Sequence, residues 1–414
     1  MENNFIIKVT RKIGEWLGVD LGYYIRNNFY LLTAQVIILL CGLTSSIVLA
    51  RLLPKESYGQ YNYIFSIIGI LTISSLPGMN AAIVNAVANR NDRVLITGTK
   101  KKLKWSLIGA VVCLFVGFYY YSSGESLLAK CFIGASLLFP LYASLNTFYP
   151  FLDGRRLFNL SARYRSGYWI FLTMAVILAV YLTKNLLWVV IAYLVTATIL
   201  ESGFLFNTIK RSKLSRSEDS TAITYGKQLT GIQAMGLAAL QFDRLIIGVA
   251  LGYSGLAVYS IARMIASLPT ILLGSVSTTI FPKIAAMDES IAYTEVKKRL
   301  PWLIVSMIIV CGIGALLCPY VIPWLYSSKY LDSVLYTQLL FIPVIVGTPA
   351  AILRRGALQA QRKSKELFKL NMAVSIFELI TMLLFALKFG ILGIIIARTL
   401  ARTFDSAYSW VLTR

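Results

Sequence analysis

Runs of about 20 apolar residues recur along the whole of this chain, and only short polar breaks separate them. A run of that length crosses the hydrocarbon core of a bilayer as a single α-helix. Hydrophobic residues make up 57% of the 414 residues and the mean hydropathy is +0.70, both far above the values of a soluble protein of this length. We therefore expect an all-α polytopic membrane protein, with no stretch left for a folded soluble domain.

The apolar runs and the breaks between them predict twelve transmembrane helices. In chain order the predicted spans cover residues 29–50, 60–87, 105–121, 131–152, 166–183, 187–207, 228–251, 256–281, 301–323, 333–353, 368–387 and 391–412.

The placement of the cations says more than the net charge of +22, which in a soluble protein would suggest a nucleic-acid partner. Alternate breaks hold 30 of the 40 lysines and arginines, the opposite breaks hold six, and four lie within spans. Cytoplasmic loops of membrane proteins carry such an excess of positive charge. The sequence therefore predicts a multi-pass protein with both termini in the cytoplasm, surrounded by membrane lipids, with no nucleic-acid partner.

Weak internal repetition indicates that the chain consists of two related halves, as many transporters do. The matching positions are Tyr61 with Tyr259, Trp105 with Trp302, and residues 157–160 with residues 367–370. We predict two six-helix lobes, at residues 1–212 and 213–414.

Away from the ends of the predicted spans, eight charged residues lie inside them, and seven of the eight are in the second half. They are Arg244, Arg263, Arg398, Arg402, Glu201, Asp243, Glu378 and Asp405. A charge at the bilayer centre costs about 3 kcal/mol on insertion scales, so it usually faces a bundle interior or a wet cavity. Because the cations and carboxylates balance, two interpretations stay open: ion pairs that fix the packing of the helices, or contacts with a transported ligand.

Helix geometry separates these charges further. Asp243 and Arg244 point about 100° apart, so they cannot both face one direction, whereas Arg398, Arg402 and Asp405 fall within about 60° of one another. The presence of arginine rather than lysine favours a phosphate ligand, because the guanidinium fork binds phosphate oxygens in pairs and stays charged when desolvated. The predicted substrate-binding residues are Arg244, Arg263, Arg398 and Arg402.

The sequence contains few residues of the types that carry out catalysis or bind metal ions. The chain has no histidine, and its five cysteines all lie in apolar runs. Histidine is the commonest proton-transfer residue in enzymes and a common metal ligand. We therefore expect neither an enzyme nor a metal site, disulfide framework or cofactor.

Two short segments resemble a known family. The run ARLLPKESYG at residues 50–59 and the run FDRLIIG at residues 242–248 are similar to segments of the Wzx-type flippases, the O-antigen and capsule translocases that carry lipid-linked oligosaccharides. Residues 255–286 continue the likeness, which extends more loosely over the whole chain. Only Asp243 and Arg244 match the family pattern residue by residue.

The resemblance implies membership of the multidrug/oligosaccharidyl-lipid/polysaccharide exporter superfamily, with two pseudosymmetric six-helix lobes around a central cavity. It also implies that undecaprenyl-diphosphate-linked repeat units of a surface polysaccharide, such as lipopolysaccharide O-antigen or capsule, cross the bacterial plasma membrane from the inner to the outer leaflet. A polysaccharide polymerase and chain-length proteins would be partners. Alternating access driven by a proton or sodium gradient needs a coupling carboxylate, for which the candidates are, in order, Glu378, Asp405, Asp243 and Glu201.

Three alternatives differ in specific features. A multidrug/cation antiporter of the same superfamily would favour acidic residues in its cavity, against the four interior arginines here. A polysaccharide polymerase or ligase would hold a long outer loop, and every predicted outer loop is short. A peptidoglycan-precursor flippase usually has two further spans, for which this chain lacks room.

Overall fold

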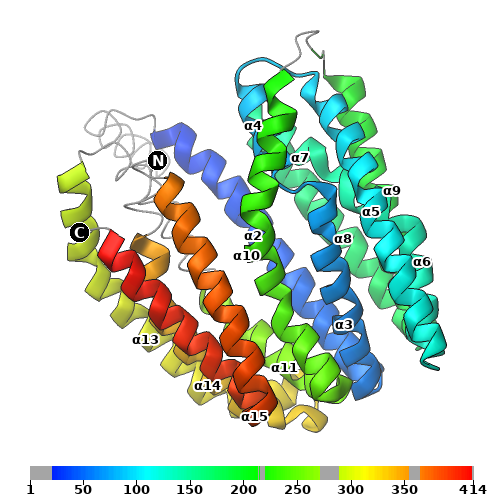
Figure 1. The fold of residues 1–414 in the computed structure, drawn as a ribbon, viewed down its shortest axis with the longest axis vertical. Helices are drawn as coiled ribbons and strands as arrows, with labels where there is room; N and C mark the ends of the chain where they lie inside the picture. Colours follow the sequence, from blue (N-terminus) through cyan, green and yellow to red (C-terminus); the bar gives the residue numbers. More distant parts are fainter. Residues whose placement is uncertain (1–20, 213, 215–219, 271–288, 354–363, 413–414) are drawn as a thin grey trace, which may run out of the picture.

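The computed structural model describes residues 21–212, 214, 220–270, 289–353 and 364–412, and every regular element within these ranges is a helix (Figure 1). The first half contains α2 (Leu21–Leu52), α3 (Lys55–Leu71), η1 (Thr72–Ser75), α4 (Met79–Ala88), α5 (Val94–Ser122), α6 (Ser126–Ser144), η2 (Leu145–Thr147), α7 (Phe148–Gly154), α8 (Phe158–Thr183) and α9 (Leu186–Arg211). The second half contains α10 (Ser220–Ala250), α11 (Gly252–Ala266), α13 (Glu289–Tyr326), η3 (Ser328–Tyr330), α14 (Asp332–Leu353) and α15 (Ser364–Leu412).

The described helices coincide with the predicted spans. Within the described ranges, nine helical segments are long and apolar enough to cross a membrane, and the segments 55–75 and 79–88, bent by 47° at a short break, pass the same test when taken together. The predicted eighth span is described only through α11, because residues 271–288 lie outside the described ranges. In lipid a helix satisfies all of its backbone hydrogen bonds internally, which explains why apolar runs take this form. The all-α polytopic fold predicted from the sequence is confirmed.

The bend between η1 and α4 exposes backbone groups that a neighbouring helix satisfies. Leu76 adopts a left-handed conformation, with a φ of 59°, and Pro77 follows it. The backbone N–H of Gly78 then donates to Oγ1 of Thr230 on α10, at 3.0 Å. A broken span is tolerated in a membrane where protein covers the break.

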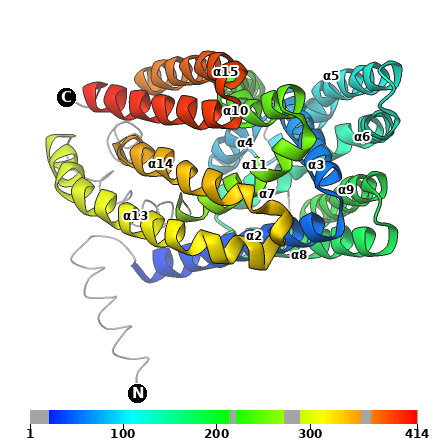
Figure 2. The same ribbon diagram turned by 90° about the horizontal axis from the view of Figure 1, so that it is seen from below.

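Helix α15 contains two antiparallel arms. From Phe368 to Leu412 it covers 45 residues, about 68 Å at 1.5 Å per residue, which is more than twice the hydrocarbon thickness. Gly390 interrupts the helix with φ 60° and ψ −135°, a conformation that glycine adopts readily. The chain reverses there, and the arms lie side by side (Figures 1 and 2). They correspond to the predicted spans 368–387 and 391–412.

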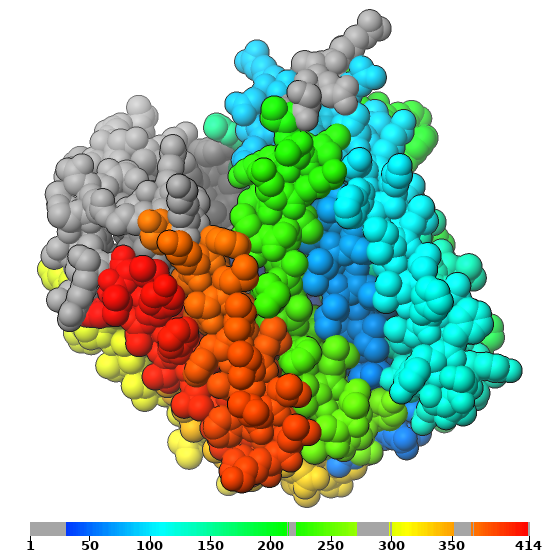
Figure 3. Space-filling model, in the orientation of Figure 1, coloured from blue at the N-terminus to red at the C-terminus, as the bar shows by residue number. Residues whose placement is uncertain are grey.

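The two halves meet mainly where α3 and α4 of the first half pack against α10 and α11 of the second. Gly59 of α3 lies so close to the backbone of Tyr253 that a Cβ atom at this position would collide with its carbonyl group. The rings of Tyr63 and Tyr253 meet edge to face beside this contact, with centroids 5.4 Å apart. In the space-filling view α10 (green) lies between α15 and α3 (Figure 3).

Polar contacts also join the halves at one end of the molecule, near the α2–α3 turn. Arg51 donates from Nε to the carbonyl oxygen of Leu325 at 2.7 Å, and a second donor on the same guanidinium reaches the carbonyl of Trp324. Lys329 Nζ donates to the carbonyl oxygens of Arg51 and Leu53, at 3.2 and 3.3 Å. This end, which the charge distribution predicts to be external, is closed in the structure.

Large apolar side chains remain exposed along the outer helices. Examples are Phe115 on α5, Leu137 on α6, Leu178 on α8 and Leu316 on α13. A contiguous apolar surface of this kind is rare on a soluble monomer and suits contact with lipid.

Candidate substrate and coupling sites

Asp243 on α10 has none of its surface exposed and contacts more charged groups than any other carboxylate in the described part of the second half. Arg263 on α11 donates from Nη1 to both carboxylate oxygens at 2.8 Å, and Arg398 on α15 reaches Oδ2 at 2.9 Å. The hydroxyl of Tyr259 donates to Oδ2 at 2.6 Å, and the backbone N–H of Arg244 donates to Oδ1 at 2.8 Å. The carboxylate therefore holds three helices together.

Within this cluster the cations outnumber the carboxylates. Two guanidinium groups surround one carboxylate, so the buried group has a net charge of +1. Arg263 also donates from Nη2 to the carbonyl oxygen of Leu240, at 2.8 Å, which fixes its orientation further. Breaking a buried ion pair by removing one partner costs about 3–5 kcal/mol, because the other charge is left uncompensated. Asp243, Arg263 and Arg398 thus stabilise the packing of α10, α11 and α15.

The guanidinium of Arg244 contacts a residue of its own helix and forms no ion pair with Asp243 in the described part of the chain. Its Nη1 donates to Oε1 of Gln241 at 3.3 Å, a long hydrogen bond. Its buried Nε atom has no hydrogen-bond partner within the described part of the chain. A guanidinium with an unsatisfied donor can take up an oxygen of a ligand without losing an existing bond.

Arg402 on α15 is held loosely by two carboxylates. Its nitrogens lie 3.8 Å from Oε2 of Glu378 and 3.6 Å from Oδ2 of Asp405, beyond hydrogen-bonding distance. The Arg402 side chain is 30% exposed, whereas Glu378 and Asp405 are buried. This second cluster faces the surface more than the Asp243 cluster does.

The structure therefore brings together seven of the eight interior charges and separates Glu201 from them. Glu201 lies on α9 in the first half, where its partner charge is Lys102. The second half is left with four arginines and three carboxylates. Glu201, the eighth interior charge, belongs to another site.

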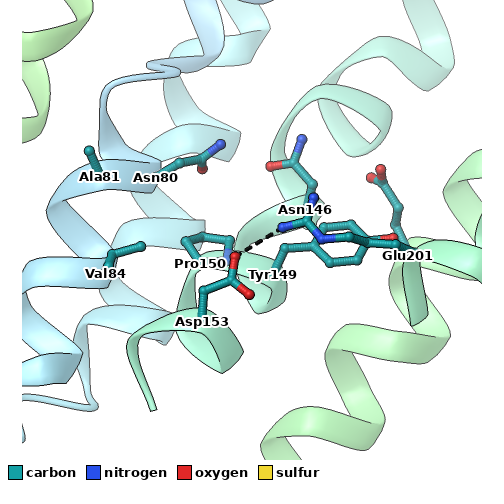
Figure 4. Close-up of a pocket in the computed structure, with 9 residues that line it drawn as sticks. Asn80, Ala81, Val84, Asn146, Tyr149, Pro150, Asp153 and Glu201 are labelled. Atoms are coloured by element: carbon teal, nitrogen blue, oxygen red, sulfur yellow. Dashed lines mark hydrogen bonds and ion pairs between the residues drawn. The ribbon is translucent and has the colours of Figure 1, made fainter. Parts of the chain in front are cut away.

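That other site is a pocket of about 420 Å³ in the first half (Figure 4). Helices α4, α7, α8 and α9, with the turn η2, supply its walls. The lining residues are Asn80, Ala81, Val84, Asn146, Tyr149, Pro150, Asp153, Arg165 and Glu201.

Lys102 is buried beside this pocket, although it belongs to a segment that the sequence predicts to be a cytoplasmic loop. It is 1% exposed and lies within α5. Its Nζ donates to Oδ1 of Asn80 at 3.1 Å and to Oδ1 of Asn146 at 2.7 Å. Its neighbours Lys100 and Lys104 are exposed, so the sequence shows one cationic run and gives no sign that its middle member is buried.

The charges around the pocket cancel. Arg165 forms an ion pair with Asp153, at 3.0 Å between Nη2 and Oδ2, and its guanidinium lies over the Tyr149 ring at 4.6 Å. Glu201 is 5% exposed, and its Oε2 atom has no hydrogen-bond partner among the described residues. The first half thus offers a neutral polar pocket and the second half a cationic interior.

Comparison with known structures places this architecture among membrane transporters. The structure titled lipid II flippase MurJ, inward closed conformation, matches with a TM-score of 0.71 at 16% identity, over 92% of this chain and 86% of that one. A MATE protein in complex with MaD5 matches with a TM-score of 0.67 at 14% identity, over 94% and 95%. An outward-facing multidrug resistance MATE family transporter of the MOP superfamily matches with a TM-score of 0.66 at 13% identity, over 95% and 94%. At these identities the likeness is one of fold, and the fold is that of the MurJ and MATE transporters.

The family follows from the sequence of residues 24–288, which match the family described as polysaccharide biosynthesis protein. The match covers more than half of the chain, so the protein belongs to this family. Among curated proteins, none matches the sequence.

Proposed function

We propose that this protein is a Wzx-type flippase that moves undecaprenyl-diphosphate-linked oligosaccharide repeat units from the inner to the outer leaflet of the bacterial plasma membrane. The observation that carries the proposal is the cationic interior of the second half, where four arginines face three carboxylates. An excess of guanidinium groups suits a diphosphate better than a cationic drug. Membership of the polysaccharide biosynthesis family supports the same substrate class.

In this mechanism the sugar headgroup and its diphosphate enter between the two six-helix lobes while the polyprenyl tail stays in lipid. Arg244 and Arg402 contact the diphosphate directly, because neither guanidinium is paired with Asp243 and the nitrogens of Arg402 lie beyond hydrogen-bonding distance of its two carboxylates. Arg263 and Arg398 add positive charge while bound to Asp243. The lobes then rock to expose the site on the other side.

A proton or sodium gradient drives the cycle through a buried carboxylate. Glu378 remains the first candidate, since its nearest described cation, on Arg402, lies 3.8 Å away. Asp405 stands second. Asp243 and Glu201 follow, because Asp243 is fully bonded and Glu201 lies in the other half.

The closed end formed by Arg51 and Lys329 supports a state in which the site does not open to the outside. The charge distribution supports an orientation with both termini in the cytoplasm.

A deletion of the gene tests the function in cells. The repeat unit, still attached to its lipid, should accumulate in the cytoplasmic leaflet, and the surface polymer should be lost. A normal surface polymer in the deletion strain would contradict the proposal.

The MATE-like fold makes the multidrug/cation antiporter the second candidate. The same deletion strain separates the two, because loss of an antiporter would raise sensitivity to cationic drugs while leaving the surface polymer intact.

A further inference from the structure

The hydrogen bonds of Lys102 fix the chemistry of the first-half pocket. An ammonium group only donates, so both asparagines must turn their Oδ1 atoms toward it. The carboxamide nitrogens of Asn80 and Asn146 are then left as donors. Neither Nδ2 atom bonds to another group within the described part of the chain, and both residues line the pocket. An asparagine side chain can both donate and accept a hydrogen bond. Because Lys102 takes the acceptor oxygen of each asparagine, the two side chains are left as hydrogen-bond donors of fixed orientation.

Glu201 supplies the complementary acceptor. Its side chain lines the same pocket, and its buried Oε2 atom lacks a hydrogen-bond partner among the described residues. A buried carboxylate oxygen without a partner is costly, so a ligand that donates to it gains from the contact. Figure 4 shows the polar ends of Asn80, Asn146 and Glu201 toward the same side of the view.

The net charge of the pocket indicates which kind of ligand it can bind. Lys102 and Arg165 are offset by Glu201 and Asp153, so no net positive charge is available for a phosphate. What remains is a set of neutral donors beside an acceptor. A sugar hydroxyl both donates and accepts, and several hydroxyls on one ring can meet such a set at once. The volume of about 420 Å³ lies within the usual range of small-ligand pockets.

We infer that the pocket lined by Asn80, Asn146 and Glu201 binds a sugar of the transported headgroup through its hydroxyl groups, with Lys102 as the residue that orients the two asparagines. The inference rests on the proposed function and extends it. The second half holds the diphosphate, and the first half recognises the carbohydrate.

Aspartate substitutions separate this role from a structural one. In Asn80→Asp and Asn146→Asp an oxygen remains for Lys102, so the buried ammonium keeps its acceptors, but the Nδ2 donor is lost. If the asparagines only satisfy Lys102, these variants should behave like the wild type. Asn85→Asp is the matched control, because it adds the same charge to an exposed position of α4 outside the pocket.

Binding is measured on the purified full-length protein with two probes. One is the lipid-linked repeat unit extracted from cells that lack the protein, and the other is undecaprenyl diphosphate without sugar. We expect either pocket variant to bind the glycosylated probe about tenfold more weakly than the wild type, as the loss of a well-placed donor implies. Binding of undecaprenyl diphosphate should be unchanged, which also shows that the variants are folded, and Asn85→Asp should bind both probes normally.

Each other result has a distinct meaning. Unchanged binding of the glycosylated probe by both pocket variants would overturn the sugar site and leave the flippase proposal standing. Equal weakening for both probes would overturn it as well, because the pocket would then act on the diphosphate. If the wild type binds neither probe, the flippase proposal fails and the sugar site fails with it.

Discussion

Arg398 on the second arm of α15 lies 2.9 Å from the carboxylate of Asp243 on α10, and this ion pair joins the last helix of the chain to the first helix of the second half. Arg263 on α11 contacts the same carboxylate. The adjacent motif residues Asp243 and Arg244 therefore differ in their contacts: the Asp243 carboxylate is paired with two arginines, whereas Nε of Arg244 has no hydrogen-bond partner among the described residues.

The first prediction concerns stability. Asp243→Asn leaves two buried guanidinium groups without a counter-charge, at a cost of about 3–5 kcal/mol. The amount of the variant in membranes, measured with a fluorescent fusion, should fall several-fold. Combining Asp243→Asn with Arg263→Gln removes one charge of each sign and should recover part of the loss. Normal abundance of Asp243→Asn would show that the cluster does not support the fold.

The second prediction concerns the ligand arginines. Arg244→Ala and Arg402→Ala should be present at normal abundance but produce little surface polymer, because neither side chain completes the Asp243 cluster. The lysine variants keep the charge but lose the paired donors, so they should retain intermediate activity. Arg263→Ala, which leaves Asp243 with one arginine fewer, is the contrasting variant and should lose abundance as well. Full polymer from Arg244→Ala would remove this residue from the diphosphate site.

The third prediction concerns coupling. Glu378→Gln keeps the shape of the side chain but cannot exchange a proton or bind a cation by charge. Flipping in this variant should no longer respond to an imposed gradient, while binding of the lipid-linked substrate is retained. The matched comparison is Asp405→Asn, which also replaces a carboxylate by an amide of the same shape. Gradient-dependent flipping at the wild-type rate by Glu378→Gln would transfer the coupling role to Asp405.

The fourth prediction concerns the closed end. Lys55 and Asp332 form a 3.4 Å ion pair between the two halves at this end. Cysteines at both positions, in a background without the five native ones, should be joined by a bifunctional methanethiosulfonate cross-linker that replaces the long lysine side chain, holds the end together and stops transport. Reduction, which releases the cross-linker, should restore transport, and each single cysteine variant serves as control. Full activity of the cross-linked double variant would show that this end need not open.

The spans were predictable from the sequence because the signal is local. Twenty apolar residues in a row require a helix in lipid whatever surrounds them. The angle of about 100° between Asp243 and Arg244 follows in the same way from the pitch of one helix. Even the reversal within α15 follows from the break between two apolar runs, at Lys388 and Gly390.

The partners of the interior charges were not predictable, because they depend on contacts between distant helices. Nothing in the sequence indicates that Arg263 and Arg398 share one carboxylate. The burial of Lys102 was harder still to predict, because its acceptors Asn80 and Asn146 come from two other elements. Glu201 was recognised as an interior charge of the first half, but its proximity to the buried Lys102 appears only in the fold.

Reconstituted vesicles test the central claim most directly. The purified protein is placed in vesicles that contain the undecaprenyl-diphosphate-linked repeat unit, and a membrane-impermeant glycosidase reports how much of the sugar reaches the outer leaflet. We expect an imposed ion gradient to raise the accessible fraction well above that of protein-free vesicles, and Arg244→Ala to abolish the increase. An accessible fraction equal to that of protein-free vesicles, with correctly folded protein present, would contradict this claim.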